Sequence, residues 1–248
     1  MKRILSAVVT TFLATTVNSA PIIFFGEDLN NSSSVPLAST PNADSAFGDF
    51  SSNLTGVSTE DFESQATGTT SSISLNFPGS AGSIGATLTG SNMAIRSVPA
   101  GSTTGAGRYP TSGTQFLEAN AIDFTIDFTQ AISAFGFWGV DIGDFGGTVS
   151  LDLINGGTQT IQVPNTQGSG GSTDGSVLFF GFFDLNDSFT SITFDITSSG
   201  DIFAFDDMII ADEGQIVVDP VNPVPAPATF ALIAAGLLGM RQYSRKKN

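Results

Sequence analysis

The sequence of 248 residues contains no cysteine and no histidine. Without cysteine, neither a disulfide nor a thiolate metal site can stabilise the fold. Without histidine, the commonest general base and the commonest transition-metal ligand are both missing. Lysine occurs only at positions 2, 246 and 247, so the long middle of the chain cannot form a Ser–Lys pair or a lysine Schiff base. Any catalysis there would have to use carboxylates.

Positive charge is also scarce in the middle of the chain. Between residues 21 and 225, Arg96 and Arg108 are the only basic residues, while all 23 acids fall in this stretch, which gives it a net charge of −21. A surface of this charge repels nucleic acid and attracts cations. The composition therefore excludes a nucleic-acid partner.

The first 20 residues have the three parts of a secretory signal peptide. Lys2 and Arg3 form a positive start, the stretch 4–17 is mostly apolar or small, and Ser19 and Ala20 close it with small residues. This order predicts a signal peptide over residues 1–20 and an exported protein. An uncleaved N-terminal anchor and an ordinary buried helix are the alternatives.

The C-terminus combines a proline motif, a short apolar run and a basic end. We expect a linker over 213–227, a membrane helix over 228–241 and a basic cytoplasmic tail over 242–248. The prolines leave the helix shorter than the roughly 20 residues of a full span. A buried core helix is the alternative, but such helices seldom end in a block of positive charges. The proline motif consists of Val224, Pro225, Ala226 and Pro227.

This tail resembles the PEP-CTERM sorting signal of Gram-negative bacteria, which joins a Val-Pro-Glu-Pro-like motif to a short membrane helix and a basic end. Ala226 stands where that family usually has glutamate. The resemblance implies processing by an exosortase-type enzyme after anchoring in the inner membrane. It also implies a protein in the cell envelope or outside the cell, in a bacterium that makes extracellular polysaccharide.

Residues 21–212 show strand periodicity throughout. Apolar and polar residues alternate over 73–77, 122–128, 149–153 and 192–196, and the stretches 133–142 and 177–183 are almost wholly apolar. The candidate strands 149–154 and 158–163 flank Asn155-Gly156-Gly157. Asn-Gly is typical of hairpin turns, so the two strands are predicted to form a hairpin. The pattern predicts an all-β domain, an antiparallel β-sandwich of jelly-roll-like form. Residues 30–45 and 166–175, rich in small polar residues, are predicted to be loops.

The acids suggest a structural calcium site. Calcium prefers six to eight oxygen ligands, and carboxylates are the usual source of them. If the first and last strands of the sandwich lie side by side, Glu63 comes close to Asp206 or Asp207, and Asp141 with Asp144 forms a further candidate. The alternative is that these acids are solvated charges that keep the protein soluble.

Two aromatic side chains are candidates for sugar contacts. Trp138 and Tyr109 could stack on the apolar face of a sugar ring, although the apolar neighbours of Trp138 favour a place in the core. We therefore expect a non-enzymatic protein associated with the extracellular polysaccharide matrix, with glycan binding as one form of that role. The alternatives are a β-sandwich glycosidase that uses a carboxylate pair and a purely structural surface protein.

Overall fold

The computed structural model describes residues 20–120, 122–142, 149–154, 158–164, 174–196 and 202–217. The predicted signal peptide up to residue 19, the sorting motif and the predicted membrane helix lie outside these residues. Among the described residues, no helix is both long enough and apolar enough to cross a membrane. The described residues up to Ile216 form one compact unit, which contains all elements of the sandwich.

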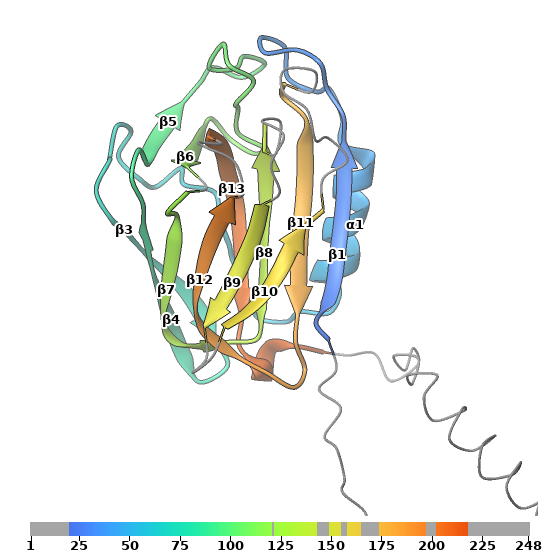
Figure 1. The fold of residues 1–248 in the computed structure, drawn as a ribbon, viewed down its shortest axis with the longest axis vertical. Helices are drawn as coiled ribbons and strands as arrows, with labels where there is room; N and C mark the ends of the chain where they lie inside the picture. Colours follow the sequence, from blue (N-terminus) through green and yellow to red (C-terminus); the bar gives the residue numbers. More distant parts are fainter. Residues whose placement is uncertain are drawn as a thin grey trace, which may run out of the picture. The chain divides into compact units, whose positions relative to one another are not determined.

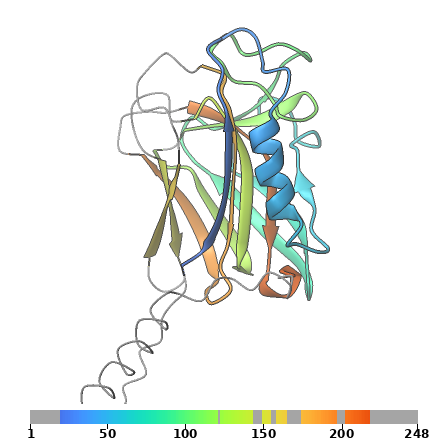
Figure 2. The same cartoon turned by 90° about the vertical axis from the view of Figure 1, so that its right-hand side faces the viewer.

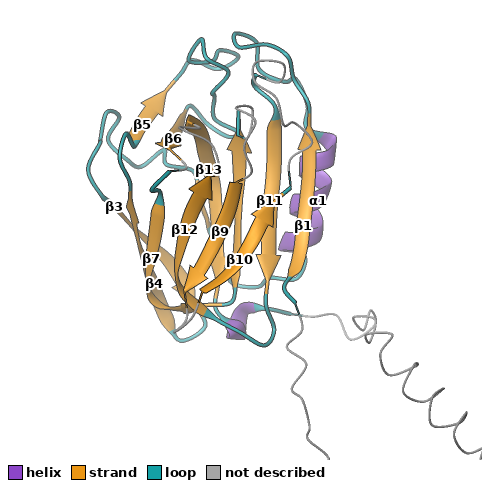
Figure 3. Cartoon of the chain, viewed as in Figure 1, coloured by secondary structure: helices purple, strands orange, loops and turns teal. Residues whose placement is uncertain are grey.

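Two antiparallel sheets pack face to face in the described part of the chain (Figure 1, Figure 3). The first sheet runs in the order β1 (Ile22–Asp28), β11 (Val177–Phe183), β8 (Ala134–Val140), β13 (Ile202–Ala211), β6 (Gln115–Asn120) and β5 (Ala94–Ser97), and the short β2 (Thr59–Glu60) pairs with β13. The second sheet runs in the order β10 (Thr158–Val163), β9 (Val149–Ile154), β12 (Phe189–Ile196), β7 (Thr125–Ile132), β4 (Gly82–Thr89) and β3 (Ile73–Gly79). The predicted β-sandwich is therefore confirmed.

Several strands lie where the sequence predicts them. β9, β10 and β11 begin and end at the predicted residues, and β9 pairs antiparallel with β10 as a hairpin requires. The predicted turn at 155–157 lies outside the described residues. The prediction that the alternation of β7 begins at Ile122 is wrong, because the amide of Ile122 donates to the side chain of Asn120 and the residue is 52% exposed in a turn.

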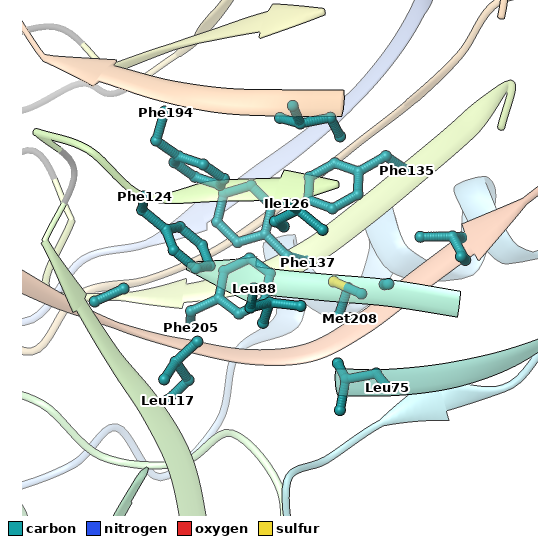
Figure 4. Close-up of a cluster of buried hydrophobic side chains, with 14 of the residues drawn as sticks. Leu75, Leu88, Leu117, Phe124, Ile126, Phe135, Phe137, Phe194, Phe205 and Met208 are labelled. Atoms are coloured by element: carbon teal, nitrogen blue, oxygen red, sulfur yellow. The ribbon is translucent and has the colours of Figure 1, made fainter. Parts of the chain in front are cut away.

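The core between the sheets is built mainly from phenylalanine (Figure 4). Four rings contact one another in a closed circuit: Phe124 lies 5.0 Å from Phe194 and 5.2 Å from Phe205, and Phe137 lies 5.4 Å and 5.1 Å from the same two rings. Phe137 and Phe205 come from one sheet, while Phe194 comes from the other and Phe124 immediately precedes β7. The prediction that most phenylalanines are core residues is confirmed.

A helix covers part of the outer face of the first sheet (Figure 2). The loop predicted over 30–45 is present up to residue 40, but residues 41–45 instead form the start of this helix. Helix α1 (Pro41–Ser51) buries Ala43, Ala46 and Phe50, which share one helical face. Its N-terminus is capped from β1, because the backbone amides of residues 42 and 43 both donate to the Asp28 carboxylate at 3.0 and 2.9 Å. The 3₁₀ turn η1 (Glu213–Gln215) and an isolated bridge from Leu54 to Ile216 follow β13.

Glycines in the sheet let this helix approach closely. A Cβ atom on Gly136 would meet the ring of Phe50 at 2.8 Å, and one on Gly181 would meet the same ring at 3.0 Å. These two glycines are register partners on β8 and β11, so they form a shallow furrow that receives Phe50. A side chain at either position would push the helix away from the sheet.

Candidate functional site

The candidate site lies on the outer face of the first sheet, beside α1. Side chains alternate along β8, so Phe135 and Phe137 enter the core between the sheets while Trp138 points to the outer face. Trp138 lies 5.9 Å from Phe47 of α1 and 5.7 Å from Phe179 of β11, measured between ring centroids. These contacts leave 8% of Trp138 exposed.

Loops from distant parts of the sequence meet at the upper end of the view in Figure 1, and they line the same pocket as Trp138. The carbonyl of Ser33 accepts bonds from the amide of Gly107 at 2.9 Å and from the hydroxyl of Thr103. The hydroxyl of Tyr109 donates to the carbonyl of Gly175 at 2.8 Å and accepts from the amide of Leu37 at 3.1 Å. Tyr109 therefore joins three segments, and it is only 5% exposed.

These loops, α1 and the sheet enclose an open pocket of about 630 Å³. This volume lies within the range of about 300–1,000 Å³ that is usual for small-molecule sites. The lining combines the three rings of Phe47, Tyr109 and Trp138 with prolines, small residues, five serine or threonine residues and two acids. Its members are Pro36, Leu37, Ala38, Ser39, Thr40, Asp44, Phe47, Thr59, Pro99, Ala100, Gly101, Ser102, Tyr109, Pro110, Thr111, Gly113, Trp138, Val177 and Asp207. Both residues predicted to contact a glycan thus line the same pocket.

The acids of the predicted calcium site hold one wall of this pocket in place. Asp206 is fully buried, and its Oδ2 accepts the backbone amides of Thr111 and Ser112 at 2.8 and 3.3 Å. The two carboxylate oxygens of Asp207 accept the hydroxyls of Thr111 and Ser112, both at 2.8 Å. Glu63 accepts the backbone amides of residues 114 and 115. All three acids therefore bind the segment 111–115.

Burial and charge shift the pKa values of these acids in different directions. Burial, and next the Asp207 carboxylate, raise the pKa of Asp206 well above its ordinary value. Burial is also the main reason why the pKa of Asp207 is raised. The exposed Glu63 differs, since the backbone amide of Thr114 lowers its pKa. The 206–207 pair is therefore the part of the site that retains a proton most readily.

The positions of these acids follow from a different strand arrangement than the sequence analysis assumes. The expectation that the first and last strands are neighbours is wrong, because β11 and β8 separate β1 from β13. Instead β2 lies beside β13, with Glu60 opposite Met208. This pairing places Glu63, which follows β2 in the sequence, near the part of β13 that contains Asp206. β13 is bulged here, and Asp207 has a positive φ of 47°.

Asp141, also a predicted metal ligand, belongs to a separate ion-pair network. Arg108 contacts Asp141 at 3.5 Å and Glu118 at 3.0 Å, and Arg96 contacts Glu118 at 2.8 Å. Asp141 further accepts the amide of Gly175 at 3.0 Å. The network thus uses both arginines of the stretch 21–225, and it balances the buried carboxylates of Glu118 and Asp141.

No three acids gather closely enough to hold a metal ion within the described ranges. Asp144, the predicted partner of Asp141, lies outside those ranges. The four predicted ligands within the described ranges accept hydrogen bonds from amides, hydroxyls or an arginine: Glu63, Asp141, Asp206 and Asp207. The calcium site therefore stays a prediction.

Sequence reasoning missed Phe47 and Asp44, the two residues that α1 contributes to the pocket. The stretch 41–51 is rich in Asn, Asp, Ser and Gly, which have low helix propensity. The available signal was the spacing of Ala43, Ala46 and Phe50, together with glycines inside the apolar strands, which mark places where another element approaches closely.

Comparison with known proteins gives little further information. No family model matches the sequence, and no curated protein matches it significantly. Among solved structures, the chain is similar to the K2 cleaved adhesin domain of Lys-gingipain, with a TM-score of 0.37 and 17% identity, over 61% of this chain and 96% of that one. It is also similar to TmCBM61 in complex with β-1,4-galactotriose, with a TM-score of 0.26 and 13% identity, over 50% of this chain and 86% of that one. At these scores, neither likeness bears on the function of this chain.

Proposed function

We propose that this protein is an exported, non-catalytic module that binds a saccharide in the pocket beside Trp138. The saccharide belongs to an extracellular polysaccharide matrix, with which the protein associates at the cell surface. The observation that carries the proposal is the pocket itself, which gathers three aromatic residues and five hydroxyl-bearing residues around one opening. Aromatic rings contact the apolar faces of sugars, and hydroxyl groups exchange hydrogen bonds with the sugar hydroxyls.

The location is proposed from the two ends of the chain. The signal-like start and the PEP-CTERM-like tail support export, anchoring in the inner membrane and processing by an exosortase-type enzyme. A surface of net charge −21 over residues 21–225 supports a partner other than nucleic acid.

A non-catalytic role is favoured by the state of the pocket acids. A glycosidase would need two carboxyl groups free to act on the sugar, and Asp44 and Asp207 are the two acids that line the pocket. Both oxygens of Asp207 already accept a hydroxyl, from Thr111 and Ser112. Since these bonds hold the carboxylate against the pocket wall, they support a structural role for Asp207 over a catalytic one.

The test is binding by the full-length protein to neutral gluco-, galacto- and manno-oligosaccharides, first on an array and then by calorimetry. Ala100→Trp should block the pocket and weaken binding by at least about tenfold, because Ala100 is exposed and lines the opening. Ala81→Trp is the matched control, since Ala81 is an exposed turn residue between β3 and β4 and does not line the pocket.

Three results would contradict the proposal. If none of these oligosaccharides binds, and charged forms of the same sugars do not bind either, the module does not recognise saccharides of these classes. If Ala100→Trp binds as well as Ala81→Trp, the pocket is not the site. If the bound oligosaccharide is shortened during the experiment, the non-catalytic assignment is wrong.

A further inference from the structure

We propose that the pocket selects an amino sugar, a saccharide with a free ammonium group, over the neutral and acidic forms of the same sugar. This inference rests on the proposed function, because it specifies the saccharide that the pocket takes. Its basis is the charge, the hydrogen-bonding capacity and the aromatic lining of the pocket.

The residues with ionisable carboxyl or basic side chains in the pocket lining are both aspartates. Asp44 lies in the first turn of α1 and Asp207 lies in the bulge of β13, and no basic residue lines the pocket. A carboxylate or sulfate on a sugar would be repelled here, while an ammonium group would be attracted. The lining therefore discriminates among sugars by charge.

The nearest source of positive charge is already committed elsewhere. Arg96 and Arg108 are the only basic residues between positions 21 and 225, and both are ion-paired with Glu118. Neither arginine lines the pocket. The negative potential at the opening is therefore not cancelled by a neighbouring cation within this domain, and it extends about one Debye length, roughly 8 Å at physiological salt.

The two acids retain capacity to accept further hydrogen bonds. A carboxylate oxygen has two lone pairs, and each oxygen of Asp207 uses one of them for a hydroxyl of Thr111 or Ser112. The Oδ1 atom of Asp44 accepts a hydrogen bond from the hydroxyl of Thr40 at 3.2 Å. An ammonium group has three N–H donors and can donate charge-assisted hydrogen bonds to such oxygens. These bonds are shorter and stronger than neutral ones.

The aromatic lining favours the same ligand. Phe47 is half-buried, and its centroid lies 5.9 Å from that of Trp138, so the two rings form a joint apolar wall on one side of the pocket. Such rings attract cations through the negative potential of their faces, most strongly in the case of tryptophan. They also contact the apolar face of a sugar ring, which a simple amine does not offer.

The volume and lining of the pocket favour an amino sugar over a lysine side chain. A lysine side chain presents one ammonium group on an apolar stem. The pocket instead offers about 630 Å³ and five residues with hydroxyl groups, which suit a ring that carries hydroxyls as well as the ammonium group. We therefore assign the ammonium group to a saccharide.

The experiment compares two ligands that share one sugar backbone and differ in the group on C2, which is a charged amine in one and a neutral acetamide in the other. Binding of the full-length protein to glucosamine oligomers and to N-acetylglucosamine oligomers of equal length is measured by calorimetry at a pH where the amine is protonated. The glucosamine oligomer should bind at least about tenfold more tightly, and added salt should reduce this ratio. Asp44→Asn should lower the ratio toward one. Asp49→Asn, an exposed acid on the same helix outside the pocket, should leave it unchanged.

Each possible result has a distinct meaning. Equal affinity for the two oligomers, or a ratio that Asp44→Asn leaves intact, overturns the selection by charge but not saccharide binding itself. Hexalysine binding as tightly as the glucosamine oligomer overturns the assignment to a saccharide. If neither oligomer binds and the neutral oligosaccharides fail as well, it is the proposed function that falls.

Discussion

The close contact between α1 and β1 can be tested at one glycine. A Cβ atom on Gly26 would overlap the backbone carbonyl oxygen of Asn42, and it would lie 2.5 Å from the carbonyl carbon of Asn42 and 3.0 Å from the amide nitrogen of Ala43. These are backbone atoms, so no side-chain rotation can relieve the overlap. Gly26→Ala therefore forces the first turn of α1 to move.

The size of the effect follows from the distances. The carbonyl carbon must retreat by roughly 0.9 Å to reach the 3.4 Å of an ordinary contact, and the caps from Asp28 to residues 42 and 43 stretch with it. Adding one methyl group to a tightly packed site costs about 1–3 kcal/mol, and weakening a cap adds up to about 1 kcal/mol. We expect Gly26→Ala to lower the free energy of unfolding by about 2–3 kcal/mol.

Gly48 provides the matched control, because it lies within α1 and has no atom within 4 Å of where its Cβ would be. Gly48→Ala should raise the free energy of unfolding by about 0.5–1 kcal/mol, since alanine is the better helix former. Thermal melting followed by circular dichroism should show a decrease of about 4–12 °C for Gly26→Ala and a small increase for Gly48→Ala. If the melting temperature of Gly26→Ala equals that of the parent protein, α1 does not pack closely on β1.

Three further predictions concern the acids and the tail. Because burial and Asp207 raise the pKa of Asp206, the folded state keeps a proton that the unfolded state releases. The free energy of unfolding measured in urea should therefore fall as the pH rises above about 4. Asp206→Asn should flatten this slope, and parallel pH profiles of the two proteins would contradict the prediction. Calcium bound by Glu63 with Asp206 or Asp207 should raise the free energy of unfolding by about 2.7 kcal/mol at a hundredfold excess over its dissociation constant, and the melting temperature should rise with it. Glu63→Gln should remove this response. Magnesium or sodium acting equally well would show charge screening alone. Deletion of residues 230–248 should release the protein from the membrane fraction, and unchanged fractionation would refute the anchor.

The strands were predictable because burial leaves a simple pattern in them. β11 (Val177–Phe183) is apolar throughout and is buried on both faces, by the core and by α1, so its run of apolar residues marks its ends directly. β10 alternates because one face is exposed. Neither pattern specifies which strands are neighbours, and the assumption that β1 lies beside β13 failed for this reason.

The helix was not predictable from local preference, because its stability comes from tertiary contacts. Asp28, which caps the helix, lies on a strand that ends well before Pro41, and the furrow for Phe50 is formed by glycines about 90 and 130 positions further along the chain. The pocket could be predicted only in part for the same reason. Trp138 and Tyr109 could be named from their chemistry, but the contribution of Phe47 depends on where α1 lies.

The same scarcity of positive charge that marks the sequence determines how the site is built. With two arginines available, most buried acids are satisfied by neutral donors: Asp28 by amides at the start of α1, Asp184 by amides at positions 186 and 187, and Asp206 by amides at positions 111 and 112. An amide or hydroxyl stabilises a carboxylate without removing its net charge. The loop that forms the pocket wall is therefore held by two acids that have no basic partner among the described residues and whose pKa values are raised, mainly by burial. The ammonium ligand that we propose would bring a positive charge to this wall.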